Sequence, residues 1–296
     1  MDFYNELEKY KNIVENELKK VLNDLDLPQQ KIVESMRYSL LSGGKRLRPI
    51  LLIKSCELFG GNIKSAIKFS IAMEMIHTYS LIHDDLPAMD DDDYRRGQLT
   101  NHKVYDESIA ILAGDALLNH AYEVMIDEVI ANDYSKEYIN AMNVISKASG
   151  YKGMIGGQVV DIISEKKQID YKTLNFIHKY KTSKLIEASI IAGATIGGAN
   201  TEQINILKKY SEYIGISFQI KDDILDIVGD KNILGKDIGS DIEKKKSTYV
   251  SIYGMEKSKS DLNMYKEKAI EIMKKIESDE SIFFMDLAEY LTKRVN

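Results

Sequence analysis

The chain has 296 residues, a hydrophobic fraction of 44% and a formal net charge of −6, with its 40 basic residues spread along its length. This composition excludes a largely disordered chain and argues against nucleic acid as a partner. Only 3 prolines interrupt a sequence rich in Ile, Leu, Lys and Glu, so we expect an all-α protein. The single cysteine, Cys56, lies in an apolar stretch, which predicts a buried thiol and a reducing, cytoplasmic location.

The N-terminal residues 1–22 have helical spacing and mixed charge. This pattern differs from the basic and then apolar pattern of an export signal. The most apolar later stretch, residues 188–199, is interrupted by glycine and is too short to cross a bilayer. We therefore expect no stable membrane insertion.

Two long helices are predicted, at residues 63–85 and at about 202–228, and both are apolar around most of their circumference. Each has aspartates near its C-terminal end. No stretch shows a convincing strand alternation, and no linker or change of composition divides the chain, so residues 1–296 are expected to form a single domain. Glycine pairs are expected to separate the helices, at 43–44, 60–61, 156–157 and 197–198.

Six aspartates stand within ten positions at the end of the first long helix, in the stretch IHDDLPAMDDDDYRRG (82–97). Asp84 and Asp85 are followed by Asp90, and Pro87 between them is expected to distort the turn. In the second helix, Asp222 and Asp226 are four residues apart, so their carboxylates share one helical face.

Clustered carboxylates on apolar helices repel one another and are costly to desolvate unless a cation neutralises them. Oxygen ligands favour hard ions, and Mg²⁺ is usually held by one or two carboxylates together with waters and a substrate phosphate. The two acidic clusters therefore predict Mg²⁺ bound around a diphosphate.

The three following aspartates, residues 91–93, are interpreted as a solvated acidic loop. An EF-hand does not fit, because Arg95 stands where its glycine is required and Asn101 stands at its twelfth position. Calcium sensing is therefore not supported.

With these features the sequence resembles the trans-isoprenyl diphosphate synthases, and most closely the bacterial farnesyl diphosphate synthases. The two aspartate-rich motifs of that family appear here, in the family's order, as DDLPAMD (84–90) and DDILD (222–226). Further matching stretches extend over nearly the whole chain: GGKRLRP (43–49), RRG (95–97), GDALL (114–118), GGQVVD (156–161), KTSKL (181–185), FQIKDD (218–223) and GKD (235–237).

The resemblance implies a single-domain helical bundle around a central cavity. It also implies an enzyme that joins isopentenyl diphosphate to an allylic diphosphate, dimethylallyl or geranyl diphosphate, with release of pyrophosphate. The implied metal ligands are Asp84, Asp90, Asp222 and Asp226, holding about three Mg²⁺ per active site, with Mn²⁺ as a substitute. Asp85 and Asp223 are expected to support these ligands by hydrogen bonds.

The resemblance also assigns the substrate contacts. Isopentenyl diphosphate is expected to bind a metal-free basic pocket of Gly44, Lys45, Arg48, His77 and Arg96. The allylic diphosphate is assigned to Arg95, Lys181 and Lys236. The resemblance also places Thr182 and Gln219, together with Lys181, near the allylic carbon chain, where the neutral oxygens of Thr182 and Gln219 can stabilise the positive charge that develops. Gln158 and Asp161 are expected either to support this site or to serve helix packing.

Product length is assigned to Tyr79 and Ser80, which lie about 6 to 7.5 Å below Asp84 at the rise of a helix. Tyr79 is the bulkier residue and is expected to stop the chain at farnesyl diphosphate, with geranylgeranyl diphosphate as the alternative. A terpene cyclase and a non-catalytic partner subunit are less well supported, because both aspartate-rich motifs and the basic pocket are intact. A homodimer is expected from the resemblance.

Overall fold

The computed structural model describes residues 2–24, 26–165, 167, 169–228 and 248–293. Over this part of the chain the all-α prediction is confirmed. The helices are α1 (Phe3–Val21), α2 (Gln30–Leu40), α3 (Leu47–Glu57), α4 (Ile63–Asp84), α5 (Asn101–Tyr105), α6 (Glu107–Ala131), α7 (Lys136–Ser149), α8 (Met154–Ser164), α9 (Tyr171–Ile177), the π-helical turn η1 (His178–Ser183), α10 (Lys184–Ile196), α11 (Thr201–Val228), α14 (Tyr249–Tyr253), α15 (Met255–Met273) and α16 (Ser281–Lys293).

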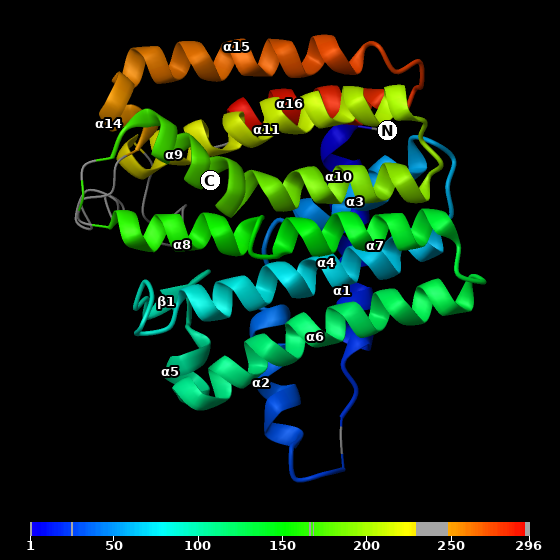
Figure 1. Cartoon of the computed structure of the whole chain (residues 1–296), viewed down its shortest axis with the longest axis vertical. Coiled ribbons are helices and arrows are strands. Elements are labelled where there is room, and N and C mark those ends of the chain that lie inside the picture. Colours follow the sequence, from blue (N-terminus) through cyan, green and yellow to red (C-terminus); the bar gives the residue numbers. More distant parts are fainter. Residues whose placement is uncertain (1, 25, 166, 168, 229–247, 294–296) are drawn as a thin grey trace.

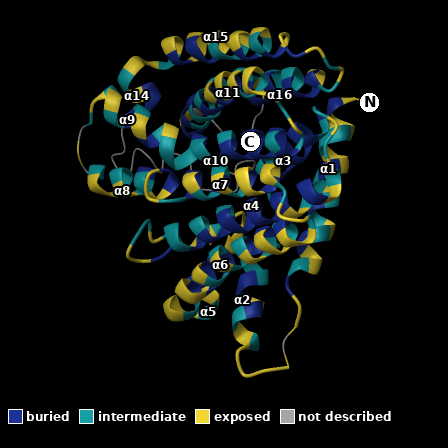
Figure 2. Ribbon diagram, turned by 45° about the vertical axis from the view of Figure 1, so that its right-hand side comes forward, coloured by how far each residue is buried: buried dark blue, intermediate teal, exposed yellow. Residues whose placement is uncertain are grey.

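The helices lie in stacked layers, with α15 at one edge of the molecule and α5 and α6 toward the other (Figure 1). Helix α4 packs against α3 and α6, and α10 packs against α3, α7 and α11. Because α4, α3 and α10 lie inside the stack, most of their side chains are buried, whereas α15 exposes its outer face (Figure 2).

The two predicted long helices are present as α4 and α11. Asn62 caps the N-terminus of α4, where its side chain accepts hydrogen bonds from the amides of Lys64 and Ser65. The helix ends at Asp84 because Pro87 follows in the next turn and cannot donate a backbone hydrogen bond. The first acidic motif therefore lies at the C-terminal end of a buried helix, as expected.

Two sequence expectations need correction. A two-residue hairpin pairs Tyr94–Arg95 with Gln98–Leu99, so the chain has a minimal antiparallel ladder where no strand was predicted. The glycine pair at 156–157 lies inside α8 and does not separate helices. A Cβ on Gly157 would lie 2.2 Å from the backbone nitrogen of Lys181, so this glycine allows α8 to touch η1.

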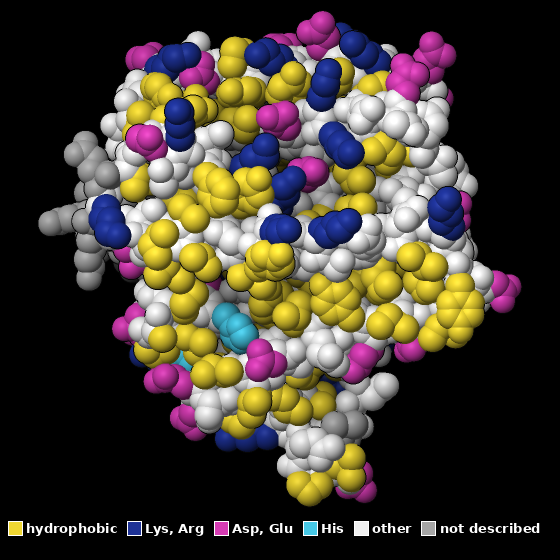
Figure 3. Space-filling view, viewed as in Figure 1, with side chains coloured by type: hydrophobic (Ala, Val, Ile, Leu, Met, Phe, Trp, Pro, Cys, Tyr) yellow, Lys and Arg dark blue, Asp and Glu magenta, His cyan; other side chains and the backbone are white. Residues whose placement is uncertain are grey.

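Helix α6 is long and apolar enough to cross a membrane by length and composition, and 33% of its most apolar window is buried. Its outward side carries exposed Ile111, Leu112 and Ile126. On α8, Ile155 and Val159 are exposed as well, and hydrophobic side chains gather over both helices in Figure 3. We call this surface the α6/α8 face.

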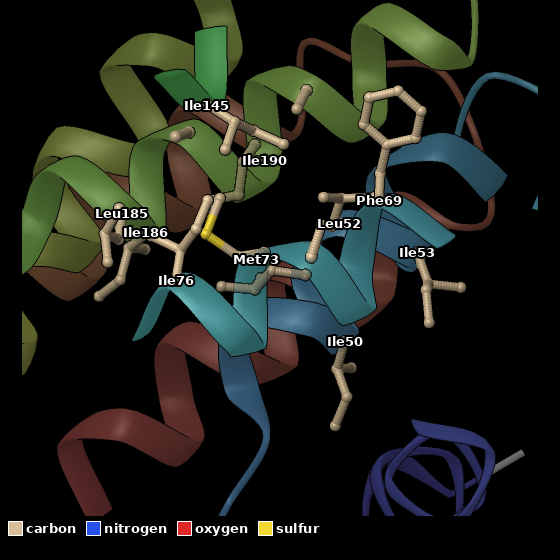
Figure 4. Packing of buried hydrophobic residues seen from close by; sticks show 14 of the residues in the cluster. Ile50, Leu52, Ile53, Phe69, Met73, Ile76, Ile145, Leu185, Ile186 and Ile190 are labelled. Atoms are coloured by element: carbon tan, nitrogen blue, oxygen red, sulfur yellow. The ribbon is translucent and has the colours of Figure 1, made fainter. Parts of the chain in front are cut away.

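The core lies between α3, α4, α7 and α10. Figure 4 shows Leu52, Met73, Ile145 and Ile190 meeting from these four helices, and all four are fully buried. Gly193 lets α10 approach closely, because a Cβ there would lie 2.0 Å from the carbonyl oxygen of Leu52. This packing fixes the α4 end that carries the first acidic motif.

A buried ammonium group joins the N-terminal helix to the C-terminal part of the chain. The side chain of Lys54 on α3 has no exposed surface, and its Nζ lies 2.6 Å from carboxylate oxygens of Glu6 and Glu57 and 2.5 Å from one of Glu280. Tyr10 donates a further hydrogen bond of 2.6 Å to Glu57. Burial opposes the charge on Lys54, but the three carboxylates outweigh it and raise its pKa.

Replacing Lys54 by methionine should lower the free energy of unfolding by about 2–4 kcal/mol, because three carboxylates would lose their shared cation while staying partly exposed. Urea denaturation of full-length protein measures the loss. Lys68→Met, at an exposed position on α4, is the matched control and should change stability little. Equal effects of the two substitutions would show that the Lys54 cluster does not stabilise the fold.

Candidate active site

The first acidic motif closes on itself at the end of α4. The amide of Asp90 donates a 2.9 Å hydrogen bond to the carbonyl of Asp84, which returns the chain toward the helix end. The side chains of Asp84 and Asp90 are partly exposed, whereas Asp85 is buried. Two carboxylates of the motif therefore remain accessible from solvent.

Lys181 lies beside this motif and comes from the π-helical turn η1. Its Nζ is 2.6 Å from an oxygen of Asp161 and 3.6 Å from one of Asp84. Gln158 on α8 donates a short hydrogen bond to the same Asp84 oxygen. Burial disfavours the charge on Lys181, but Asp84, Asp161 and Asp90 outweigh it and raise its pKa, so the amine stays protonated at neutral pH.

The second acidic motif lies near the C-terminal end of α11. Asp222 is partly exposed and lines a cavity of about 210 Å³ together with Lys181, Thr182 and Gln219. Asp226, one turn later, is buried. The spacing predicted one shared face for Asp222 and Asp226, but the structure exposes Asp222 more than Asp226.

Asp223 is buried and has an oriented carboxylate. It accepts hydrogen bonds of 2.9 Å from Nε2 of Gln219 and 2.6 Å from the amide of Tyr249. His178 lies 3.9 Å away, and burial lowers its pKa to about 4 although Asp161 opposes the shift. The imidazole is thus neutral at physiological pH, and Asp223 holds the amide group of Gln219 in place.

A basic cavity of about 440 Å³ gathers the residues of the predicted metal-free pocket. Its wall includes Gly44, Lys45, Arg48, His77 and Arg96. Arg48 Nη1 lies 3.4 Å from His77 Nε2, and Nε of Arg48 is buried without a hydrogen-bond partner among the described residues. Such unsatisfied guanidinium donors favour an anion in this cavity.

Gly44 has a role that its sequence position did not predict. A Cβ at Gly44 would lie 2.7 Å from Cζ of Arg96, so the glycine makes room for this guanidinium. Arg96 also donates a short hydrogen bond to the carbonyl of Gly43. With φ at +123°, Gly44 occupies a backbone region that other residues rarely adopt.

Arg46 anchors the backbone between Lys45 and Arg48. It has a positive φ of 51° and is buried, and its guanidinium donates to Glu15 at 2.6 Å, to Glu74 at 2.5 Å and to the Leu40 carbonyl at 2.8 Å. Glu74 stands one turn before His77 on α4. Neither role was predicted from the sequence, although the lone carboxylate in the apolar stretch IAMEMI (71–76) was a signal for Glu74.

An apolar cavity of about 480 Å³ extends from Asp84 along α4 and shares Arg48 and His77 with the basic cavity. Tyr79 and Ser80, the two predicted chain-length residues, both line it. Ser80 donates a 2.7 Å hydrogen bond to the carbonyl of His77, whereas the hydroxyl of Tyr79 has no partner among the described residues. Burial raises the pKa of Tyr79 to about 12.

Lys181 and Thr182 lie on the walls of both the apolar cavity and the Asp222 cavity. Leu118 on α6 and Ile155 on α8 complete the apolar wall. The role of these two aliphatic residues was not predicted from the sequence, because only the packing of α6 and α8 brings them to this cavity.

Arg95 pairs with Asp85, a contact that was not predicted from the sequence. Its Nε lies 2.7 and 2.9 Å from the two carboxylate oxygens of Asp85, so its side chain pairs with this aspartate. Burial raises the pKa of Asp85 to about 6, although Arg95 opposes the shift. Of the following acidic loop, Asp93 pairs with Lys103 at 2.8 Å. Lys236, predicted to bind the allylic diphosphate, lies outside the described residues.

The donor set fits a hard divalent cation. Asp84, Asp90 and Asp222 offer partly exposed carboxylate oxygens, which are hard ligands. Asp84, Asp90 and Asp222 could hold Mg²⁺ through its preferred ligand type. The contact with Lys181 supplies positive charge to Asp84 without any ion.

The chain is similar to known proteins in both sequence and structure. The profile of the polyprenyl synthetase family matches residues 29–283. A farnesyl diphosphate synthase from Micrococcus luteus is 47% identical over 243 residues, which cover 82% of each chain. A chloroplastic geranylgeranyl pyrophosphate synthase from Catharanthus roseus is 44% identical over 284 residues, or 95% of this chain and 79% of that protein.

Among solved structures, a geranyltransferase from Helicobacter pylori complexed with magnesium and isoprenyl diphosphate is similar, with a TM-score of 0.82 and 29% identity. The match covers 98% of this chain and 94% of that one. The similarity thus extends over the whole site described above.

His77 should remain neutral well below pH 6.5, because burial and the nearby Arg48 and Arg96 lower its pKa. An unfolded chain would bind a proton on this histidine below about pH 6.5 while the folded chain would not, so its contribution to stability falls as the pH drops through that range. NMR titration of labelled histidine, assigned with His77→Asn, measures the midpoint. Inorganic diphosphate should raise the midpoint of His77, because its negative charge offsets the guanidinium charges of Arg48 and Arg96. A midpoint at or above pH 6.5 without added anion would show that burial and these arginines do not lower the pKa of His77.

Proposed function

The chain belongs to the polyprenyl synthetase family, and we propose that it condenses isopentenyl diphosphate with dimethylallyl or geranyl diphosphate to give mainly farnesyl diphosphate. The main support for this proposal is that three cavities adjoin one another. Lys181 lines both the Asp222 cavity and the apolar cavity, and Arg48 and His77 line both the apolar cavity and the basic cavity. The acidic motifs suit the allylic diphosphate, the basic cavity suits isopentenyl diphosphate, and the apolar cavity suits the growing hydrocarbon chain. We also propose that residues 1–296 form one domain.

The allylic diphosphate is proposed to bind at the mouth between the two acidic motifs. Up to three Mg²⁺, or Mn²⁺ in their place, would be held by Asp84, Asp90 and Asp222, with Asp226 in support. Bound there, Mg²⁺ supplies Lewis-acid stabilisation of the negative charge on the leaving diphosphate. Lys181 adds a fixed positive charge 3.6 Å from Asp84. Lys236 and Arg95 remain proposed contacts, and Arg95 would act partly by orienting Asp85.

Isopentenyl diphosphate is proposed to bind the basic cavity without metal. Lys45 and Arg96 are positioned at its wall, and Arg48 has an unsatisfied Nε for a phosphate oxygen. The neutral ring of His77 can donate one hydrogen bond without adding charge. Arg46 and Glu74 would keep Lys45 and Arg48 in register by fixing the turn between them.

Bond formation places positive charge on the allylic and then the isopentenyl carbons. We propose that the hydroxyl of Thr182 and the carbonyl oxygen of Gln219 stabilise it as fixed dipoles. The hydrogen bond from Gln219 Nε2 to Asp223 commits the amino end of this amide and leaves its oxygen for the cavity. The proton lost at the end would leave with the released pyrophosphate.

Farnesyl diphosphate is preferred over geranylgeranyl diphosphate because Tyr79 stands in the wall of the apolar cavity. Its ring packs edge-on against His83 at 5.7 Å between ring centroids, which limits its freedom to move aside. Relatives with both product names have similar identity to this chain, so the choice of C15 rests on Tyr79 alone.

Two other functions receive less support. A terpene cyclase would not need the cavity of Lys45, Arg48 and His77. A non-catalytic partner subunit would not need both acidic motifs with accessible aspartates. Pyrophosphate release that requires both substrates distinguishes elongation from either alternative.

We further propose that two copies associate through the α6/α8 face. Its exposed isoleucine, leucine and valine side chains would then be covered by protein, which accounts for the apolar character of α6 without insertion in a membrane. One relative is named as the large subunit of a heterodimeric synthase, which supports association within this family. A cytoplasmic location remains part of the proposal.

Asp84→Asn and Asp222→Asn should each lower kcat about a hundredfold or more, because each removes a charge facing the leaving diphosphate. Product formation from radiolabelled isopentenyl diphosphate measures the rates, and thermal unfolding checks the fold. Asp279→Asn, at an exposed position between α15 and α16, is the matched control. Near-native rates in both motif variants, or full turnover in metal-free buffer, would refute the proposed diphosphate site.

Tyr79→Ala should move the main product from C15 to C20 or longer, because it removes the largest obstruction in the apolar cavity. Tyr79→Phe retains the ring and should still give C15. Chromatography of the dephosphorylated products separates these lengths. A C20 main product from the wild type, or C15 from the alanine variant, would show that another residue limits growth.

A further inference from the structure

A further large cavity opens on the surface beside η1 and contains no residue of the acidic motifs. It has a volume of about 520 Å³ and lies between α7, the turn that follows it, η1, α10 and α11. We call it the outer groove. Neither acidic motif nor the basic pocket contributes a residue to it.

The outer groove is strongly basic in an acidic protein. Its wall carries Lys147, Lys152, Lys184 and Lys208, and Glu187 is the only described carboxylate among its lining residues. Lys184 pairs with Glu187 at 2.8 Å, whereas Lys147 and Lys208 have no carboxylate within 4 Å among the described residues. Lys and Arg side chains gather over α7 and α10 in Figure 3. The local excess of positive charge favours an anionic occupant.

The floor and walls of the outer groove are apolar and aromatic. Ala188 and Ile191 are almost fully buried beneath it, and Tyr151 stands largely exposed at its rim. The ring of Tyr180 is stacked on Phe176 with 4.3 Å between centroids, and Lys184 Nζ lies 5.8 Å from the centre of the Tyr180 ring. An anion that also carries an apolar tail would satisfy both the lysines and this floor.

The outer groove and the candidate active site share one turn of backbone. Tyr180 lines the groove, while the next two residues, Lys181 and Thr182, line the cavities of the active site. This turn is π-helical, with Ser183 Oγ donating to the carbonyl of His178 at 3.1 Å. π-helical turns are rare and occur often at functional sites. Gly157 lets α8 pack directly against the backbone of this turn, because a Cβ there would lie 2.6 Å from the carbonyl carbon of Tyr180 and 2.2 Å from the backbone nitrogen of Lys181.

We propose that the outer groove is a second, regulatory binding site for a small amphiphilic anion with a phosphate head and a short apolar tail. Its occupancy changes the position of Lys181 through η1. The regulatory part rests on the proposed function, whereas the binding part does not.

Binding is tested with octyl phosphate on the full chain in metal-free buffer, followed by calorimetry or tyrosine fluorescence. Lys147→Glu with Lys208→Glu should weaken binding about tenfold or more, since two charges facing the head are reversed. Lys19→Glu with Lys274→Glu, at exposed positions elsewhere, makes the same change of net charge and should leave binding unchanged. Octanol and inorganic phosphate should each bind more weakly than octyl phosphate, and salt should weaken its binding.

Several outcomes would overturn the binding proposal. These are no binding to wild type, equal binding to both double variants, and stronger lysine-dependent binding to phosphatidylglycerol vesicles than to octyl phosphate. The last outcome would identify a membrane-facing surface. None of these readouts depends on catalysis, so they remain decisive if prenyl transfer is not observed.

Regulation is tested by the rate of product formation with and without octyl phosphate. Octyl phosphate should change the KM for the allylic substrate in the wild type and in the control variant, Lys19→Glu with Lys274→Glu. The groove variant, Lys147→Glu with Lys208→Glu, should keep the basal rate without octyl phosphate but should not show this change in KM. A change that persists in the groove variant would place the effect at the active site. No change in wild type, despite binding, would refute the coupling through η1.

Discussion

The arrangement of this protein depends on holding mutually repelling carboxylates at the C-terminal ends of two long helices, α4 and α11. Asp84 at the end of α4 and Asp222 near the end of α11 are only partly exposed, so their negative charges lose part of their hydration. Lys181 reduces this cost by lying 2.6 Å from Asp161 and 3.6 Å from Asp84. Asp223 is fixed instead by hydrogen bonds from Gln219 and from a backbone amide. The acidic site is therefore preorganised before any cation binds.

Three arginines near the site fall into two groups, those paired with carboxylates and one that faces a cavity. Arg46 is neutralised by Glu15 and Glu74, and Arg95 by Asp85. Arg48 keeps an unsatisfied donor beside His77. The protein thus separates basic groups that hold the fold from basic groups that face a cavity, and this separation supports two distinct diphosphate positions in the proposed reaction.

Much of this could be predicted from the sequence, because helices and their acidic ends follow from local periodicity. The extents of α4 and α11 agree with the predictions to within about one residue. The pairing of Arg95 with Asp85, the support of Arg46 by Glu74 and the aliphatic wall from Leu118 and Ile155 could not be predicted. They depend on tertiary packing between segments that share no local pattern. The hairpin at Tyr94–Arg95 was missed because two-residue strands leave no alternation to detect.

The central claim is that Asp84, Asp90 and Asp222 form one site for divalent cations and a diphosphate together. Calorimetric titration of Mn²⁺ into the full chain, with and without inorganic diphosphate, tests it most directly. The account predicts that diphosphate tightens Mn²⁺ binding about tenfold or more, and that the double substitution Asp84→Asn with Asp222→Asn abolishes this coupling. Equal Mn²⁺ affinity with and without diphosphate, or unchanged coupling in the double variant, would contradict it.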